Sequence, residues 1–219
     1  MDPNVVPVLP LRSDPSPRQA LPMGQPVEQL REATYADIEA LPPNMVGQIL
    51  HGQLFVMPRP ASLHALACSR LGSRLDGPFG LGEGGPGGWW ILFEPELHFP
   101  NPHVKAGKDV LVPDLAGWRV EKMPEVLDVP FFTMSPDWIC EVLSPSTERI
   151  DREEKMPIYA REGVQWAWLI DPLKRSLEAY ALDGKRWNDA GRWGANELVR
   201  VAPFDAVELK LAVLWGRGS

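Results

Sequence analysis

The sequence contains few cysteines and no long apolar run, and both absences limit what the protein can be. Its 219 residues include only two cysteines, Cys68 and Cys140, which are too few for a disulfide framework. Neither has a metal-ligand partner nearby, so we expect reduced core residues and a cytoplasmic protein. No apolar stretch approaches the roughly 20 residues that cross a bilayer, and the first residues lack a signal-peptide pattern. We therefore expect no contact with a membrane.

Positive charge is also scarce. The chain has 22 lysines and arginines against 29 aspartates and glutamates, which gives a formal net charge of −7. Such a balance does not favour general affinity for nucleic acid, because whole-molecule repulsion would have to be overcome locally. It does fit a metal site built from carboxylates, which is acidic until its cation binds.

Proline is frequent at the start of the chain and sets the domain boundary. Residues 1–27 carry a proline every few positions and show neither helical nor alternating periodicity. We predict that they form a flexible arm, because such a segment cannot bury enough surface to order itself. We expect residues 28–219 to form a single domain.

The rest of the chain alternates between strand and helix patterns. Residues 46–58 are predicted to form a hairpin, and the pattern from Ser62 predicts a helix that ends before Gly77. Three strands follow, "WWILFEPELHF", "KDVLVPDLAGWRV" and "PDWICEVLS", of which the third is almost wholly apolar and therefore central. Asp151 and Glu154 form a capping box that would open a helix ending at Gly163, and further strands complete the chain. This order, αβββαβ with extra strands, predicts an α/β fold with a mixed sheet flanked by helices.

Two carboxylates stand inside apolar strand patterns, which is costly unless a positive charge or a cation compensates them. Asp114 lies in the second of the three strands and Glu141 in the third. If these strands are neighbours, both side chains can bind Mg²⁺, with water completing an octahedron. Lys155 lies in the following helix, where it can orient a metal-bound water, and Tyr159 lies over the same face.

The residues alone leave another interpretation open. Asp114 can be a turn residue after Pro113, Glu141 can pair with an arginine, and Lys155 can be a solvated helix residue. Asp151, four residues before Lys155, is a candidate cap and a candidate partner for it. Glu94 and Glu96 lie on one face of the first strand and could support the metal site, whereas Asp171 reads as a turn residue.

Several motifs resemble one family of bacterial proteins. They are "VPDLAGW", "PDWICEVLSPST", "DREEKMPIYAREGV", "WLIDP" and "PFDAVEL". This set is similar to the Uma-two family, whose members are named as restriction endonucleases in the PD-(D/E)XK nuclease superfamily. The resemblance implies a restriction-endonuclease-like core that uses Mg²⁺ or Mn²⁺. It implies that Asp114 and Glu141 are metal ligands and that the carbonyl of Val142 adds another.

The chain departs from the superfamily pattern at two positions. The usual Glu-x-Lys would place a lysine at position 143, where this chain has Leu143, and relatives supply the lysine from the following helix, at Lys155. Gln48 stands where many relatives have glutamate, so it can orient a water but adds no charge. His64 matches a histidine common in the family, for which a contact to substrate phosphate, a hydrogen bond at the helix start and a surface position remain open.

The resemblance leads to one main function and two alternatives. The main expectation is an endonuclease that hydrolyses nucleic acid, with DNA favoured, and that acts as a homodimer or larger homo-oligomer. Its catalytic residues would be Asp114, Glu141, Lys155 and Gln48, and His64 and Tyr159 would be possible substrate contacts. The first alternative is a weakened nuclease fold that binds nucleic acid or a protein partner without cutting. The second is hydrolysis of a smaller phosphate ester.

Overall fold

The computed structural model describes residues 32–58 and 60–216, and the arm predicted for residues 1–27 lies outside them. The strands are β1 (Met45–Leu50), β2 (Gln53–Pro58), β3 (Trp89–Phe93), β4 (Leu97–Pro100), β5 (Lys108–Leu111), β6 (Leu115–Arg119), β7 (Trp138–Val142), β8 (Trp166–Asp171), β9 (Ser176–Asp183), β10 (Arg186–Gly194), β11 (Leu198–Val199) and β12 (Leu209–Lys210). The helices are α1 (Tyr35–Glu39), α2 (Ser62–Leu75), α3 (Glu148–Ile150) and α4 (Met156–Arg161). Shorter helical turns are η1 (Asp76–Gly80), η2 (Asp151–Lys155) and η3 (Leu211–Val213). No helix of the described residues is long and apolar enough to span a membrane.

Most strands belong to two sheets. A six-stranded sheet, the large sheet, has the order β10-β9-β8-β7-β6-β3, and a four-stranded sheet, the small sheet, has the order β2-β1-β5-β4. In the large sheet β7 and β8 are parallel and the other pairs are antiparallel. The predicted α/β class with a mixed sheet is confirmed, and so is the central place of β7.

Two of the three strands predicted before the helix at residues 151–163 are interrupted, and each forms two shorter strands. The segment 89–99 divides into β3 of the large sheet and β4 of the small sheet, with Glu94 at a left-handed φ of 46° between them. The segment 108–120 divides into β5 and β6 around Pro113, which has no amide hydrogen for a ladder bond. The chain therefore crosses from one sheet to the other twice, and Asp114 lies at the second crossing.

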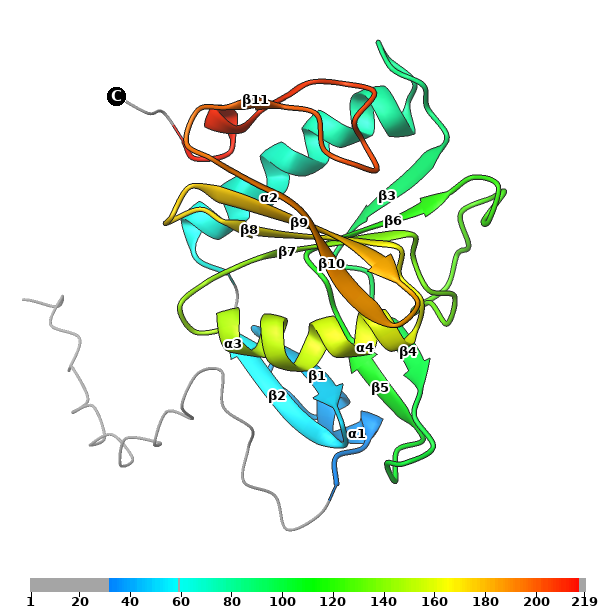
Figure 1. The fold of residues 1–219 in the computed structure, drawn as a ribbon. Coiled ribbons are helices and arrows are strands. Elements are labelled where there is room, and N and C mark those ends of the chain that lie inside the picture. The colour runs from blue at the N-terminus through cyan, green and yellow to red at the C-terminus, as the bar shows by residue number, and fades with distance from the viewer. Residues whose placement is uncertain (1–31, 59, 217–219) are drawn as a thin grey trace, which may run out of the picture.

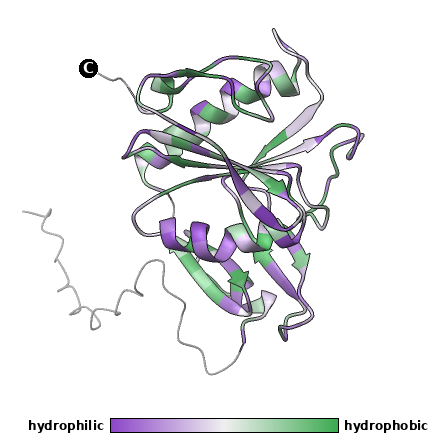
Figure 2. Cartoon of the chain, in the orientation of Figure 1, coloured by the Kyte–Doolittle hydropathy of each residue, from purple (hydrophilic) through white to green (hydrophobic). Residues whose placement is uncertain are grey.

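Helices cover both faces of the large sheet (Figure 1). α2 and the C-terminal segment lie on one face, and the continuous helical run α3–η2–α4 lies on the other, between the two sheets. The helical run begins with hydrophilic residues (Figure 2). On the apolar side of the run, Ile158 belongs to a buried cluster that also contains Leu50 of the small sheet and Ile139 of the large sheet. The two sheets are thus held together through this run, which carries Lys155.

The helical run does not start where the sequence predicted. The predicted capping box at Asp151 and Glu154 is wrong, because the helical run already begins at Glu148 and Asp151 lies within it. The π-helical turn η2 comes directly before α4, which has Pro157 in its first turn. Since proline removes a backbone hydrogen bond and clashes with the preceding turn, the wider π turn accommodates Pro157 without breaking the run.

Other local predictions are confirmed. β1 and β2 form the predicted antiparallel hairpin, with His51 and Gly52 at φ 52° and 80°, as a tight two-residue turn requires. Cys68 and Cys140 are free and buried. Asp171 is the last residue of β8, and its carboxylate accepts hydrogen bonds from the Leu173 and Lys174 amides of the turn that follows.

A bidentate ion pair ties the helical run to the large sheet. Arg152 donates to both carboxylate oxygens of Glu178 at 3.0 and 2.7 Å, and these bonds lower the pKa of Glu178 from 4.5 to about 2. A lowered folded-state pKa gives stability that is present above the ordinary value and is lost as the pH falls toward 2.

We therefore expect Glu178→Gln to lower the free energy of unfolding by roughly 1 kcal/mol at pH 7, and by less below pH ~4.5. Urea denaturation of wild type and variant at pH 7 and about 3.5 measures both differences. Equal differences at the two pH values would show that the charge on Glu178 contributes nothing.

Candidate active site

Three carboxylates lie side by side where β3, β6 and β7 meet. Leu115 of β6 pairs with Phe93 of β3 on one side and with Cys140 of β7 on the other. Three acids stand one residue beyond these pairs at the same edge of the sheet, and all three line one pocket: Glu94 after β3, Asp114 before β6, and Glu141 in β7. The predicted juxtaposition of Asp114 and Glu141 is therefore observed, because both line the same pocket.

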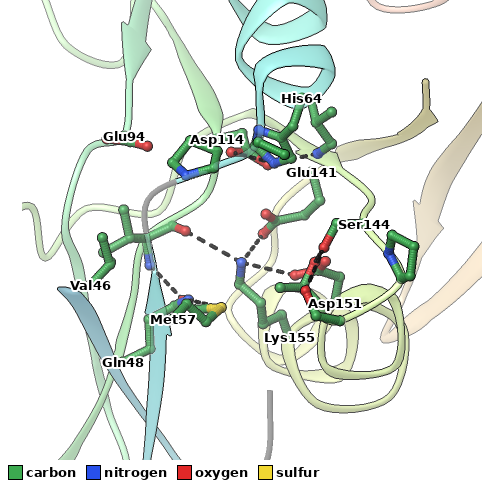
Figure 3. A pocket seen from close by; sticks show the side chains of 17 residues that line it. Val46, Gln48, Met57, His64, Glu94, Asp114, Glu141, Ser144, Asp151 and Lys155 are labelled. Carbon is green, nitrogen blue, oxygen red and sulfur yellow. Dashed lines mark hydrogen bonds and ion pairs between the residues drawn. The ribbon is translucent and has the colours of Figure 1, made fainter. Parts of the chain in front are cut away.

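These three acids border a pocket of about 480 Å³ (Figure 3). The pocket lies between the hairpin β1–β2, the start of α2, the crossing at Asp114 and the start of the helical run. Six of the seven predicted site residues line it: Gln48, His64, Asp114, Glu141, Val142 and Lys155. They come from five separate parts of the chain, and only the tertiary structure brings them together.

Lys155 is at the centre of the site and is almost wholly buried, with 2 % of its surface exposed. Its ammonium nitrogen lies 2.8 Å from Glu141 Oε1, 3.2 Å from Asp151 Oδ1 and 3.3 Å from the carbonyl oxygen of Val112. An ammonium group has three hydrogens, and these acceptors take all of them. The alternative interpretation of a solvated lysine is wrong, and the partner of Glu141 is this lysine and not an arginine.

Negative charge in the cluster exceeds the positive charge. Burial raises the pKa values of Glu141 and Asp151, and the neighbouring Asp114 raises both further, against the opposing effect of Lys155. Burial by itself would lower the pKa of Lys155, but the three surrounding carboxylates raise it above its usual value. One lysine therefore faces more carboxylates than it can neutralise.

Tyr159 lies behind Glu141 and outside the pocket wall. Its hydroxyl donates to Glu141 Oε1 at 2.6 Å, and its side chain has no exposed surface. The predicted common face with Lys155 is thus observed, since both residues contact the same carboxylate oxygen. The position holds Glu141 in place and offers no surface for contact with a substrate.

Asp114 is anchored on two sides. Its Oδ2 accepts a hydrogen bond from the Val142 amide at 2.7 Å, and its Oδ1 lies 3.2 Å from His64 Nε2. Burial would lower the pKa of His64, but the hydrogen bond and charge of Asp114 outweigh it and raise this pKa. His64 is therefore not a surface residue, and it orients one of the two predicted metal ligands.

Gln48 is buried, and its amide has partners on both sides. Its Oε1 accepts from the Val112 amide at 2.9 Å, and its Nε2 donates to the sulfur of Met57 at 3.8 Å. Val112 therefore contacts Gln48 through its amide and Lys155 through its carbonyl. Gln48 supports the backbone that holds the lysine.

The donor set is compatible with a divalent cation. In residues 32–58 and 60–216, no three His, Cys, Asp or Glu side chains form a preformed metal cluster. Mg²⁺, however, is usually bound by one or two carboxylates and keeps several waters. Asp114 and Glu141 provide hard oxygen ligands on one pocket wall, where the acidic side chains outnumber the basic ones among the described residues.

Sequence reasoning missed or misplaced some members of the site. Asp151 was expected as a cap or as a partner for Lys155, and the structure makes it the partner, bonded to Lys155 in the pocket wall. Glu94 lines the pocket. Glu96 does not line it, and its carboxylate instead contacts the hydroxyl of Tyr35 and the ring of His98. The contact of His64 with Asp114 carried no sequence signal, because it joins residues 50 positions apart in the chain.

Comparisons with known proteins agree with this geometry. The sequence model of the Uma2 family, described as "Putative restriction endonuclease", matches residues 34–213. The fold is similar to the crystal structure of a "putative nuclease belonging to DUF820" from Anabaena variabilis ATCC 29413. That comparison has a TM-score of 0.65 and 20 % identity, and it covers 84 % of this chain and 97 % of the other. No curated protein matches the chain.

Proposed function

This chain belongs to the Uma2 family, and we propose that it is a metal-dependent nuclease that hydrolyses phosphodiester bonds, with DNA as the favoured substrate. The observation that carries this proposal is the buried arrangement of Asp114, Glu141 and Lys155 around one pocket. Phosphodiester hydrolysis needs ligands for a cation, which the two carboxylates provide, and a positive charge beside the reacting phosphate, which the lysine provides.

Each residue has a defined part in this proposal. Asp114 and Glu141 would hold Mg²⁺ or Mn²⁺, with the carbonyl of Val142 as a further ligand. The bound ion would supply Lewis acidity and lower the pKa of a coordinated water. Lys155 would orient the attacking water and offset charge on the phosphate oxygens. Its longest contact, 3.3 Å to the Val112 carbonyl, is the one it can exchange for that water.

Other side chains hold this machinery in position. Tyr159 and Lys155 both bond to Oε1 of Glu141, so they restrict how its carboxylate can turn. His64 restricts Asp114 in the same way. Asp151 keeps the ammonium of Lys155 close to Glu141. Such supporting hydrogen bonds commonly change activity or metal affinity by about 10- to 100-fold.

The direct test is cleavage of defined polymers. The protein is incubated with labelled single- and double-stranded DNA and RNA in Mg²⁺ or Mn²⁺, with EDTA as the control. We expect metal-dependent cleavage of DNA that EDTA abolishes. Cleavage that persists in EDTA would contradict metal dependence, and cleavage of RNA alone would contradict the DNA preference.

The uncharged residue Gln48 leads to a separate prediction. We expect Gln48→Glu to strengthen Mn²⁺ binding by about tenfold, because a third carboxylate adds charge-based attraction at the same pocket. The glutamate can still accept the Val112 amide, but it buries another carboxylate and loses the bond to Met57, so we expect lower stability without metal. Calorimetric titration of wild type and variant with Mn²⁺ measures the difference. Unchanged affinity would place Gln48 outside the reach of the metal.

The saturation of Lys155 and the lack of charge at Gln48 favour a second candidate function. With all three lysine hydrogens taken, the pocket could hold nucleic acid without cutting it. In the cleavage experiment this function would appear as metal-independent binding of polymer, measured by filter retention, with no product in any metal.

A further inference from the structure

The groups assigned to catalysis are recessed at the bottom of the pocket. Glu141 and Lys155 have exposed fractions of 1 % and 2 %, and Gln48 has 1 %. A phosphate in an intact duplex lies on the outside of a broad, stiff rod. To reach groups buried this deeply, a strand has to leave the duplex and enter the pocket.

The volume of the pocket suits one nucleotide. At about 480 Å³ it lies in the range of small-molecule sites, about 300–1,000 Å³. Removing one nucleotide from a stack costs a few kcal/mol in a duplex and much less in a single strand.

The two sides of the pocket differ in chemistry. In Figure 3, Val46 and Met57 of the hairpin β1–β2 lie on one side of Lys155, and Asp151 and Ser144 lie on the other. Val46 and Met57 are only partly buried, so they present apolar surface to the cavity. The side with Asp151 and Ser144 suits a cation and a phosphate. Gln48 and Glu94 lie on the same side as Val46 and Met57, whose side chains provide the apolar surface for the flat face of a base.

Positive charge on the pocket wall is limited. Among the described residues that line it, only Lys155 and His64 can carry positive charge, whereas Glu94, Asp114, Glu141 and Asp151 can carry negative charge. A surface that follows many phosphates along a backbone needs a series of lysines and arginines. The described part of the wall can favour a phosphate at Lys155, and contacts with the remainder of the nucleotide would add to the affinity.

We propose that the pocket accepts one unpaired nucleotide, from a single strand or a frayed strand end, with its phosphate toward Lys155 and its base against Val46 and Met57. This assignment rests on the proposed nuclease function and names the form of its substrate. The protein then cuts where a strand is already unpaired and discriminates weakly among sequences, because an apolar wall reads no hydrogen-bond pattern.

Binding of small ligands tests the base contact without any cleavage. Calorimetry in Mg²⁺ compares deoxyadenosine 5′-monophosphate with deoxyribose 5-phosphate, which has the same phosphate and no base. We expect the nucleotide to bind at least tenfold more tightly to the wild type. Val46→Trp, which fills the apolar side, should remove most of this difference. Leu198→Trp, at an exposed position on β11 that does not line the pocket, should leave it unchanged.

Equal affinity for the two ligands, or a difference that survives in Val46→Trp, would overturn the proposal. The comparison on the wild type needs no variant, so it stands even where Val46→Trp fails to fold.

Cleavage rates separate this inference from the nuclease function itself. We expect a single-stranded oligonucleotide to be cut at least tenfold faster than the same sequence within a closed, fully paired duplex. Equal or faster cutting of the duplex would overturn the inference and leave the nuclease in place. Base-dependent binding with no cleavage of any polymer would remove the nuclease and leave a nucleotide-binding pocket.

Discussion

We expect Lys155→Met to lower the free energy of unfolding by about 3–5 kcal/mol and to abolish cleavage. The substitution keeps the length of the side chain but leaves Glu141 and Asp151 buried without the cation that lies 2.8 and 3.2 Å from them. Two uncompensated carboxylates in a buried site are costly, and a methionine cannot orient water or offset charge on a phosphate. Urea denaturation and the cleavage assay measure the two effects.

The matched control is Lys174→Met. Lys174 also pairs with acids, Glu148 and Asp171, but 62 % of its side chain is exposed. Exposed pairs contribute about 0–1 kcal/mol, so this variant should remain close to wild type in both measurements. A loss of stability at Lys155 no larger than at Lys174 would contradict the central place of the buried lysine.

The second large effect is on activity alone. We expect Glu141→Gln to reduce cleavage by at least about 10³-fold, because a neutral amide neither binds Mg²⁺ well nor helps stabilise charge in the transition state. The variant should keep its fold. Glutamine has the same shape, its oxygen can accept from both Tyr159 and Lys155, and burial, which raises the pKa of Glu141, already disfavours a charge at this position.

Two measurements distinguish this effect from unfolding. The free energy of unfolding should stay within about 1 kcal/mol of wild type, while Mn²⁺ affinity in calorimetry falls. Glu153→Gln is the control, since this helix carboxylate has 63 % of its side chain exposed and does not line the pocket. Full cleavage by Glu141→Gln would remove Glu141 from the metal site.

Local patterns predicted the elements that depend on near neighbours in the chain. The hairpin at residues 45–58, the α2 helix and the apolar strand β7 each have a periodicity or turn chemistry that can be read within a few residues. The predictions failed where a distant contact decided the outcome. Pro113 interrupts "KDVLVPDLAGWRV", but nothing local says that its two halves belong to different sheets. Asp151 looked like a cap because Glu154 follows it at the spacing of a capping box, whereas the helical run begins at Glu148.

The candidate site shows the same division. The sequence alone determined which residues were available: two carboxylates in apolar surroundings, a lysine one turn from Asp151, and the motif order of a nuclease family. The tertiary structure decided that Asp114 and Glu141 line one pocket, that Lys155 is buried between Glu141 and Asp151, and that the β1–β2 hairpin contributes apolar side chains to the pocket wall. The physical reason is that strand register and burial depend on contacts between residues far apart in the chain, and no local spacing encodes those contacts.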